Sequence, residues 1–182
     1  MPETRDLLLK KAVYEDWPDI YANLWRHPES ARYMLWDVTG SEEAARDRMR
    51  RTLAWQVSHE HAYFVYEKES GRAIGFAGMT EIEPDVWEET GVALGPDYVG
   101  RGYGKQVLTV LTGLAFARGG RTFLASCREQ NERSRRLILS RGFRPRGSER
   151  RTDERTGEEY TLLHFVLDAP EQEPRSDSAL NT

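Results

Sequence analysis

Residues 86–117 join a strand pattern, a glycine-rich turn and a helix pattern without a break, and this segment most constrains how the chain can fold. The alternation in VWEETGVAL predicts a strand over 86–94, and the apolar spacing in KQVLTVLTGLAFA predicts a helix over 105–117. Between them lies DYVGRGYGKQ (97–106), which has three glycines in five residues. Such a turn lets backbone N–H groups face one direction, and the start of a helix adds unpaired donors and partial positive charge. The segment therefore predicts a turn that binds a phosphate or pyrophosphate.

Two well-known phosphate-binding loops do not fit these residues. A Walker A loop aligned on Gly104–Lys105 needs a glycine where Val99 stands and a serine or threonine where Gln106 stands. A dinucleotide-binding GxGxxG aligned on the first two glycines places Lys105 at the third. That motif also opens a βαβ unit, whereas this segment follows a predicted antiparallel meander. Both loops are therefore disfavoured.

The rest of the chain alternates further strand and helix patterns. Strands are expected over 5–13, 61–68, 72–82, 122–127, 142–151 and 158–167, and helices over 14–25, 41–57 and 131–141. In the helix that Ser41 caps, the inward face is expected to hold Ala45, Met49, Leu53 and Val57. The order β-αα-βββ-α-β-α-ββ predicts a single α/β domain over residues 1–168, with a mixed, mostly antiparallel central sheet flanked by helices. Residues 169–182 are rich in Pro, Ser and acidic side chains, which predicts a disordered tail.

Charge argues against a general nucleic-acid binder, because the net charge of the 182 residues is −4. A run of eight arginines from Arg133 to Arg151 is the local exception. It leaves three interpretations open: a solvated helix face and strand edge, an anion site for a phosphorylated small molecule, or contact with RNA. The first is favoured because only Phe143 supplies an aromatic ring within the run.

The histidines, the cysteine and the apolar runs exclude further classes of protein. The four histidines include no HExxH pair, so no metal site is expected. Cys127 is the only cysteine, and it fits a small buried apolar residue better than a reactive thiol. No apolar run is long enough for a membrane helix, and the N-terminus has no signal-peptide cleavage site. A cytoplasmic protein without membrane partners is expected.

Two motifs carry a resemblance to a known family. EETGVALGPDYVGRGYGKQVLTVL resembles the central motif of the GNAT superfamily of N-acetyltransferases, Gln/Arg-x-x-Gly-x-Gly/Ala, with Val99 in place of the first Gln/Arg. NERSRRLILSRGF (131–143) resembles the second motif of the family, an Asn-x-x-Ser/Ala segment that ends in Gly-Phe. The resemblance covers residues 5–168. The opening residues and the YMLW segment are most similar to the branch of the ribosomal-protein-alanine N-acetyltransferases and related small-molecule enzymes.

The resemblance implies acetyl-CoA as the acetyl donor, with no metal. The implied binding residues are Val92, Ala93, Leu94, Val99, Gly100, Arg101, Gly102, Tyr103, Gly104, Lys105, Asn131 and Ser134. In the turn the backbone would bind the pyrophosphate, and Arg101 and Lys105 would add charge at its rim. A backbone N–H within Val92–Leu94 is the family's usual donor to the oxyanion.

The resemblance also implies direct attack of an amine on the thioester. An amine with a pKa of about 10 is mostly protonated at neutral pH, so a base must take its proton. Glu89 is the predicted base, with Glu81, Glu83 and Glu88 as rivals, because a bulge in this strand would change which side chains face the site. Many family members have a Tyr as the acid where this chain has Ile138. Ser134 is therefore the predicted hydrogen-bond donor to the departing thiolate.

The acceptor site is expected between the first two helices and the acidic end of the sheet. Its predicted residues are Tyr33, Met34, Trp36 and Glu81, although core packing is the alternative for the three large side chains. The acceptor would be a small-molecule amine or a protein N-terminus, and dimers are common in this branch. Because Val99 and Ile138 depart from the family pattern, a CoA-binding regulatory or interaction module without turnover stays open as the alternative.

Overall fold

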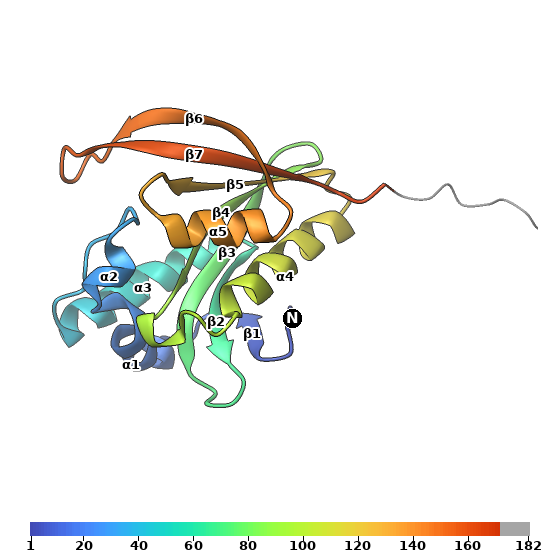
Figure 1. Cartoon of the computed structure of the whole chain (residues 1–182). Helices are drawn as coiled ribbons and strands as arrows, with labels where there is room; N and C mark the ends of the chain where they lie inside the picture. Colours follow the sequence, from blue (N-terminus) through green and yellow to red (C-terminus); the bar gives the residue numbers. More distant parts are fainter. Residues whose placement is uncertain (172–182) are drawn as a thin grey trace, which may run out of the picture.

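The computed structural model describes residues 1–171 and contains a seven-stranded sheet with helices on its two faces (Figure 1). The strands are β1 (Leu7–Lys10), β2 (Ala62–Glu67), β3 (Ala73–Glu83), β4 (Val86–Leu94), β5 (Thr122–Arg128), β6 (Arg144–Thr152) and β7 (Glu159–Asp168). The helices are α1 (Trp17–Ile20), α2 (Pro28–Ala31), α3 (Glu42–Ser58), α4 (Tyr103–Ala117) and α5 (Glu132–Ser140). Three single turns complete them: a 3-10 turn at Tyr14–Asp16, a π-helical turn at Tyr21–Trp25 and a 3-10 turn at Pro96–Tyr98.

The sheet has the order β1-β2-β3-β4-β5-β7-β6, and β4 with β5 is its parallel pair. The other neighbouring strands run antiparallel. The predicted single α/β fold with a mixed, mostly antiparallel sheet is therefore confirmed. Of the predicted disordered tail, residues 172–182 lie outside the described part of the chain.

The parallel pair separates along its length. β4 and β5 pair only where Val86–Glu88 lies beside Thr122–Leu124. From Glu89 onward, the edge of β4 that faces β5 has no strand partner in residues 1–171. The two strands therefore open a gap in the middle of the sheet.

A bulge interrupts β4 at the start of this gap. Met79 of β3 pairs with Glu89, whereas the preceding Gly78 pairs with Gly91, so Thr90 is the extra residue. Gly91 has a φ of 132°, a backbone angle that residues with a Cβ rarely adopt. The bulge expected in this strand is present, and it sets which side chains of β4 face the gap.

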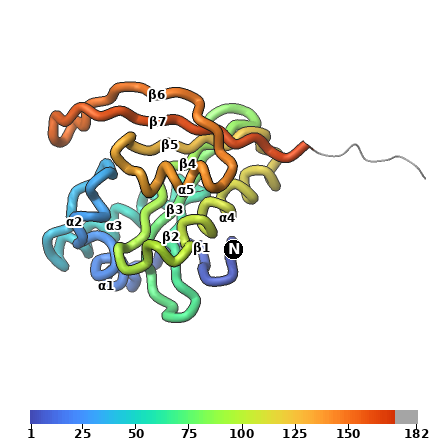
Figure 2. The backbone as a smooth tube through the Cα atoms, in the orientation of Figure 1, coloured from blue at the N-terminus to red at the C-terminus, as the bar shows by residue number. Residues whose placement is uncertain are grey.

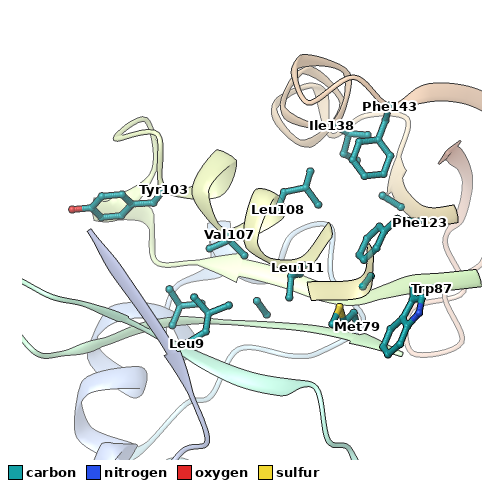
Figure 3. Close-up of a cluster of buried hydrophobic side chains, with 14 of the residues drawn as sticks. Leu9, Met79, Trp87, Tyr103, Val107, Leu108, Leu111, Phe123, Ile138 and Phe143 are labelled. Carbon is teal, nitrogen blue, oxygen red and sulfur yellow. The ribbon is translucent and has the colours of Figure 1, made fainter. Parts of the chain in front are cut away.

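Two apolar clusters hold the helices to opposite faces of the sheet. On one face Val107, Leu108 and Leu111 of α4 pack on the sheet, and Ile138 and Phe143 extend the cluster (Figure 3). On the other face the cluster consists of side chains from the first helical segment, from α3 and from β2 and β3: Ile20, Leu24, Trp25, Ala45, Met49, Phe64, Tyr66 and Ala73. Burial of these side chains stabilises the sheet from both sides.

The inward face of α3 differs from the sequence prediction at its last turn. Val57 is 88% exposed, whereas Gln56 is buried. The Gln56 side chain accepts a hydrogen bond of 3.0 Å from the Ala12 backbone N–H, just after β1. A buried polar side chain with this partner satisfies the backbone where β1 ends, so α3 turns Gln56 inward and Val57 outward.

The hairpin of β6 and β7 forms the edge of the sheet next to β5 (Figure 2). All nine residues of β6 are exposed. Arginines of the Arg133–Arg151 run pair with carboxylates on this hairpin, Arg144 with Asp168, Arg150 with Glu159 and Arg151 with Glu149, and Arg136 pairs with Glu132 on α5. This pairing agrees with the solvated-surface interpretation of the run.

Candidate active site

A cavity of about 1000 Å³ fills the gap between β4 and β5. Its walls come from α2 and the loop after it, the second half of β4, the glycine-rich turn, the end of β5 and α5. The cavity therefore brings together the two sequence motifs, which are about thirty residues apart in the chain, and the predicted acceptor region.

The glycine-rich turn has backbone angles that glycine adopts readily. Gly100 has a φ of 85° and Gly102, the N-cap of α4, has a φ of 79°. A Cβ built at either position meets no protein atom within 4 Å, so the backbone there is open on the cavity side. Close packing explains the glycine at position 104, because a Cβ there would lie 2.9 Å from Cδ2 of Leu137 in α5. The turn thus leaves a bare backbone at a helix N-terminus, as a bound phosphate requires.

The side chains of Arg101 and Tyr103 point away from this cavity. The Tyr103 hydroxyl donates a hydrogen bond of 2.8 Å to Oε1 of Glu67, and Arg101 Nη1 lies 3.3 Å from the same oxygen. Glu67 is only 5% exposed, and its hydrogen bond raises the pKa of Tyr103. Arg101 therefore does not supply charge at the cavity rim, whereas Lys105 does line the cavity. The two side chains fix the turn to β2.

Glu89 lines the cavity at the bulge and is half-buried. Burial, and secondarily the charge of Glu88, raises the pKa of Glu89 from 4.5 to about 7. Hydrogen bonds from the backbone N–H groups of Gly91 and Val92 act in the opposite direction. A carboxyl group with this pKa can take a proton near neutral pH.

The three rival carboxylates do not line the cavity. Glu81 and Glu83 are exposed near the turn between β3 and β4, where Glu81 accepts a hydrogen bond of 3.2 Å from the Asp85 backbone N–H. Glu88 alternates with Glu89 along β4 and pairs opposite Thr80. The prediction that Glu81 contacts the substrate is therefore not supported. Glu81 lies near the β3–β4 turn, away from the end of β4 that lines the cavity.

Asn131 and Ser134 of the second motif lie on the same cavity, together with Cys127 at the end of β5. The Asn131 side chain caps α5 by accepting a hydrogen bond of 3.1 Å from the Ser134 backbone N–H. Burial raises the pKa of the Cys127 thiol, the hydrogen bond with Ser134 lowers it, and the charge of Glu89 raises it. The thiol is therefore near both Glu89 and Ser134, a cluster that was missed because Cys127 alone gives no sequence signal.

The predicted acceptor residues divide into two groups. Tyr33 and Met34 line the cavity. Trp36 does not line it; its ring lies 4.6 Å from the guanidinium of Arg48, and it packs with the buried cluster under α3. The core-packing alternative thus describes Trp36, whereas Tyr33 lines the cavity and Met34 both lines it and packs against the same buried cluster.

The comparisons with known proteins agree with this geometry. The model of the acetyltransferase (GNAT) domain matches residues 6–144. The chain belongs to the GNAT acetyltransferase family. The predicted family, fold and enzyme class, an acetyltransferase, are thereby confirmed.

One curated relative and two solved structures illustrate the similarity. N-alpha-acetyltransferase RimI of Mycobacterium tuberculosis is 32% identical over 99 residues, which are 53% of this chain and 61% of that protein. The ribosomal L7/L12 alpha-N-protein acetyltransferase RimL, solved in complex with coenzyme A, is 20% identical with a TM-score of 0.74, over 92% of this chain and 96% of that one. The self-immunity acetyltransferase MccE, solved with acetyl-CoA and AMP, is 16% identical with a TM-score of 0.77, over 91% and 94%. The two solved structures therefore share the fold of this chain, and the RimI match covers less than two thirds of that relative.

Among residues 1–171, no group of three or more His, Cys, Asp or Glu side chains could hold a metal ion. In the same part of the chain, no helix is long and apolar enough to cross a membrane.

Proposed function

We propose that this GNAT protein transfers the acetyl group of acetyl-CoA to a primary amine, with Glu89 as the general base. One observation carries the proposal: Glu89, whose pKa is raised to about 7, lies on the same cavity as the bare glycine turn. The reaction needs both a place for the pyrophosphate of its donor and a base that titrates near neutral pH.

The cavity has a place for each part of acetyl-CoA. The backbone of Val99–Gly104 and the N-terminus of α4 would bind the pyrophosphate, and Lys105 would add charge beside it. The unpaired edge of β4 over Val92–Leu94 would hydrogen-bond the arm that leads to the thioester. RimL with coenzyme A and MccE with acetyl-CoA support this donor for a chain of the same fold.

At the thioester, the chemistry requires three groups. Glu89 takes the proton of the acceptor amine, whose nitrogen then attacks the carbonyl carbon. A backbone N–H of β4 within Val92–Leu94 hydrogen-bonds the oxyanion as it forms. The C–S bond then breaks, the nitrogen gives its remaining extra proton to the departing thiolate, and the Ser134 hydroxyl donates a hydrogen bond to that sulfur.

Ser134 is proposed for the thiolate because of its position on the cavity. Ile138, where many family members have a Tyr, is 2% exposed and packs in the core. It can neither donate a proton nor be replaced by a larger side chain without repacking. Asn131, as the cap of α5, positions Ser134 and is also within the cavity wall.

The acceptor is proposed to be a small-molecule amine or a protein N-terminus that contacts Tyr33 and Met34. The RimI relative, an N-alpha-acetyltransferase, and the RimL structure favour the N-terminus. A cytoplasmic location agrees with this acceptor, and a homodimer is proposed from the branch the chain resembles. No role in nucleic-acid binding is proposed, because the net charge is −4 and four of the eight arginines in the run pair with carboxylates.

An acetyl-CoA consumption screen tests the proposal. Polyamines, amino acids, amino-bearing antibiotics and N-terminal peptides are each incubated with acetyl-CoA and the protein, and release of the CoA thiol is measured. Release with at least one amine class supports the enzyme, provided that Glu89→Gln reduces it. Stabilisation by acetyl-CoA without release for any amine supports instead the alternative, a CoA-binding module, which the departures at Val99 and Ile138 keep open.

A further inference from the structure

A second cavity, which we call the α3 cavity, lies between α3 and the sheet face formed by β2, β3 and β4. Its volume is about 300 Å³, at the lower end of the range for ligand pockets. None of its lining residues lines the larger cavity. Aromatic side chains dominate its walls: Trp25, Trp55, Tyr63, Phe64 and Phe76. The α3 cavity therefore suits a small, flat, apolar group.

One positive charge in this wall, that of Arg48, has no carboxylate partner within residues 1–171. Arg48 of α3 stacks on Trp25 at 4.5 Å and on Trp36 at 4.6 Å. Its Nη1 donates to the Thr39 hydroxyl at 2.9 Å and to the Asp37 backbone carbonyl at 3.3 Å. Both of these acceptors are neutral.

The nearby carboxylate of Asp37 is already paired. Its Oδ1 lies 2.7 Å from Nη1 of Arg155, and no carboxylate in residues 1–171 lies within 4.0 Å of the Arg48 guanidinium. Burial lowers the pKa of Arg48 to about 10, so the side chain stays charged at neutral pH. A half-buried cation with no carboxylate in direct contact among residues 1–171 is unfavourable, and an anion beside it would be stabilised.

We propose that the α3 cavity binds a small aromatic carboxylate, with its ring against the aromatic wall and its carboxylate on Arg48. The Arg48 guanidinium has five N–H donors, of which only those on Nη1 have a partner in the described residues. Guanidinium and carboxylate can form two parallel charge-assisted hydrogen bonds. Arg51, which also lines the cavity, is exposed and pairs with Asp47 at 3.2 Å, so Arg48 is the residue that would bind the carboxylate.

This site is distinct from the proposed acetyl-CoA cleft, so the inference goes beyond the proposed function. Thr90 and Gly91, the bulge residues directly after Glu89, belong to the wall of the α3 cavity, whereas Glu89 lines the larger cavity. A molecule in the α3 cavity therefore contacts the bulge without occupying the place of acetyl-CoA.

Isothermal titration calorimetry of the full chain with phenylacetate and 1-naphthylacetate tests the site. The expected result is saturable binding of one molecule per chain, at least tenfold tighter than that of the matching neutral amides, with acetate showing none. Arg48→Gln should weaken the binding at least tenfold. The matched control is Arg46→Gln: Arg46 is on the same helix and stacks on Trp17, outside the cavity, so this change should leave binding as in the wild type.

A second variant keeps the test decisive if Arg48→Gln fails to fold. Thr52→Phe places a ring in the cavity while Arg48 stays, and it should abolish binding in a protein that circular dichroism shows to be folded. Acetyl-CoA at saturation should not displace the carboxylates. The proposal is overturned if neither carboxylate binds, if the amides bind equally well, if folded Arg48→Gln or Thr52→Phe binds like the wild type, or if acetyl-CoA competes.

Discussion

Arg155, in the turn between β6 and β7, lies 2.7 Å from the carboxylate of Asp37, which precedes it by 118 residues in the chain. The same guanidinium donates to the Met34 carbonyl at 2.9 Å. Asp153, which is 2% exposed, forms an ion pair of 2.7 Å with Arg155. It also pairs at 2.7 Å with Arg128, which lines the larger cavity. The hairpin turn therefore fixes the loop that carries Tyr33 and Met34.

Replacing Arg155 with Gln should loosen this loop and weaken acceptor binding. We expect the KM for the acceptor amine to rise several-fold, by the loss of about 1 kcal/mol of positioning, with the KM for acetyl-CoA unchanged. Steady-state kinetics with each substrate varied in turn measure the two values. Arg150→Gln, which breaks an exposed pair with Glu159 in the same hairpin, is the control and should change neither. Equal increases in both KM values would contradict a positioning role.

Tyr103→Phe removes the hydroxyl that joins the glycine turn to Glu67. The buried Glu67 carboxylate then keeps Arg101 and Ser70 as donors. We expect a loss of about 1 kcal/mol in the free energy of unfolding and weaker acetyl-CoA binding, because the turn is less firmly held. Urea denaturation and calorimetric titration measure these changes. Unaltered affinity together with lowered stability would show that the anchor serves the fold alone.

Gly102→Val should abolish acetyl-CoA binding, because a branched side chain would occupy the open face of the turn. At a φ of 79° the substitution also strains the backbone, by about 1–3 kcal/mol. Gly119→Val separates the two effects, since Gly119 has a φ of 91° at the end of α4 and does not line the cavity. Both variants should lose comparable stability in thermal denaturation, and only Gly102→Val should lose binding. Binding as in the wild type by Gly102→Val would remove the basis for placing pyrophosphate here.

Glu89 should make folding stability depend on pH. Its folded-state pKa of about 7 is above the ordinary value of 4.5, so the folded protein binds the proton more tightly than the unfolded chain. The wild type should therefore lose stability as the pH rises from about 4.5 to 7, relative to Glu89→Gln. Above that window the difference between the two proteins in the free energy of unfolding should be at most about 3 kcal/mol. At low pH this difference should vanish. Urea denaturation of both proteins from pH 4 to 8 measures it; parallel curves would be inconsistent with a raised pKa.

Local patterns predicted much of the fold. The alternation in VWEETGVAL matches the bounds of β4, Val86–Leu94, and α5 (Glu132–Ser140) falls within the helix expected over 131–141. These features depend on residues close together in the chain. The glycine turn was also predicted, because its glycines reflect the backbone angles of the turn itself.

The misses share a physical cause. Two sets of contacts were not predicted: those of Glu67 with Arg101 and Tyr103, and that of Arg155 with Asp37. They join residues 34 to 118 positions apart in the chain. No periodicity in the sequence predicts a contact between residues so far apart. Trp36 and Glu81 were assigned to the acceptor site from residue type and neighbourhood, and only the packing of Trp36 and the path of β3 decide where they lie.

The pH dependence of kcat/KM for acetyl transfer, in the wild type and in Glu89→Gln, tests the central claim most directly. If Glu89 is the base, the wild-type value should rise with pH through a titration near 7, because the carboxyl group must lose its proton before it can accept one from the amine. In Glu89→Gln that titration should be absent and kcat/KM should be lower by about 10²–10⁴-fold, while the affinity for acetyl-CoA stays close to that of the wild type. A Glu89→Gln profile with the wild-type rate and the same titration near pH 7 would contradict the claim.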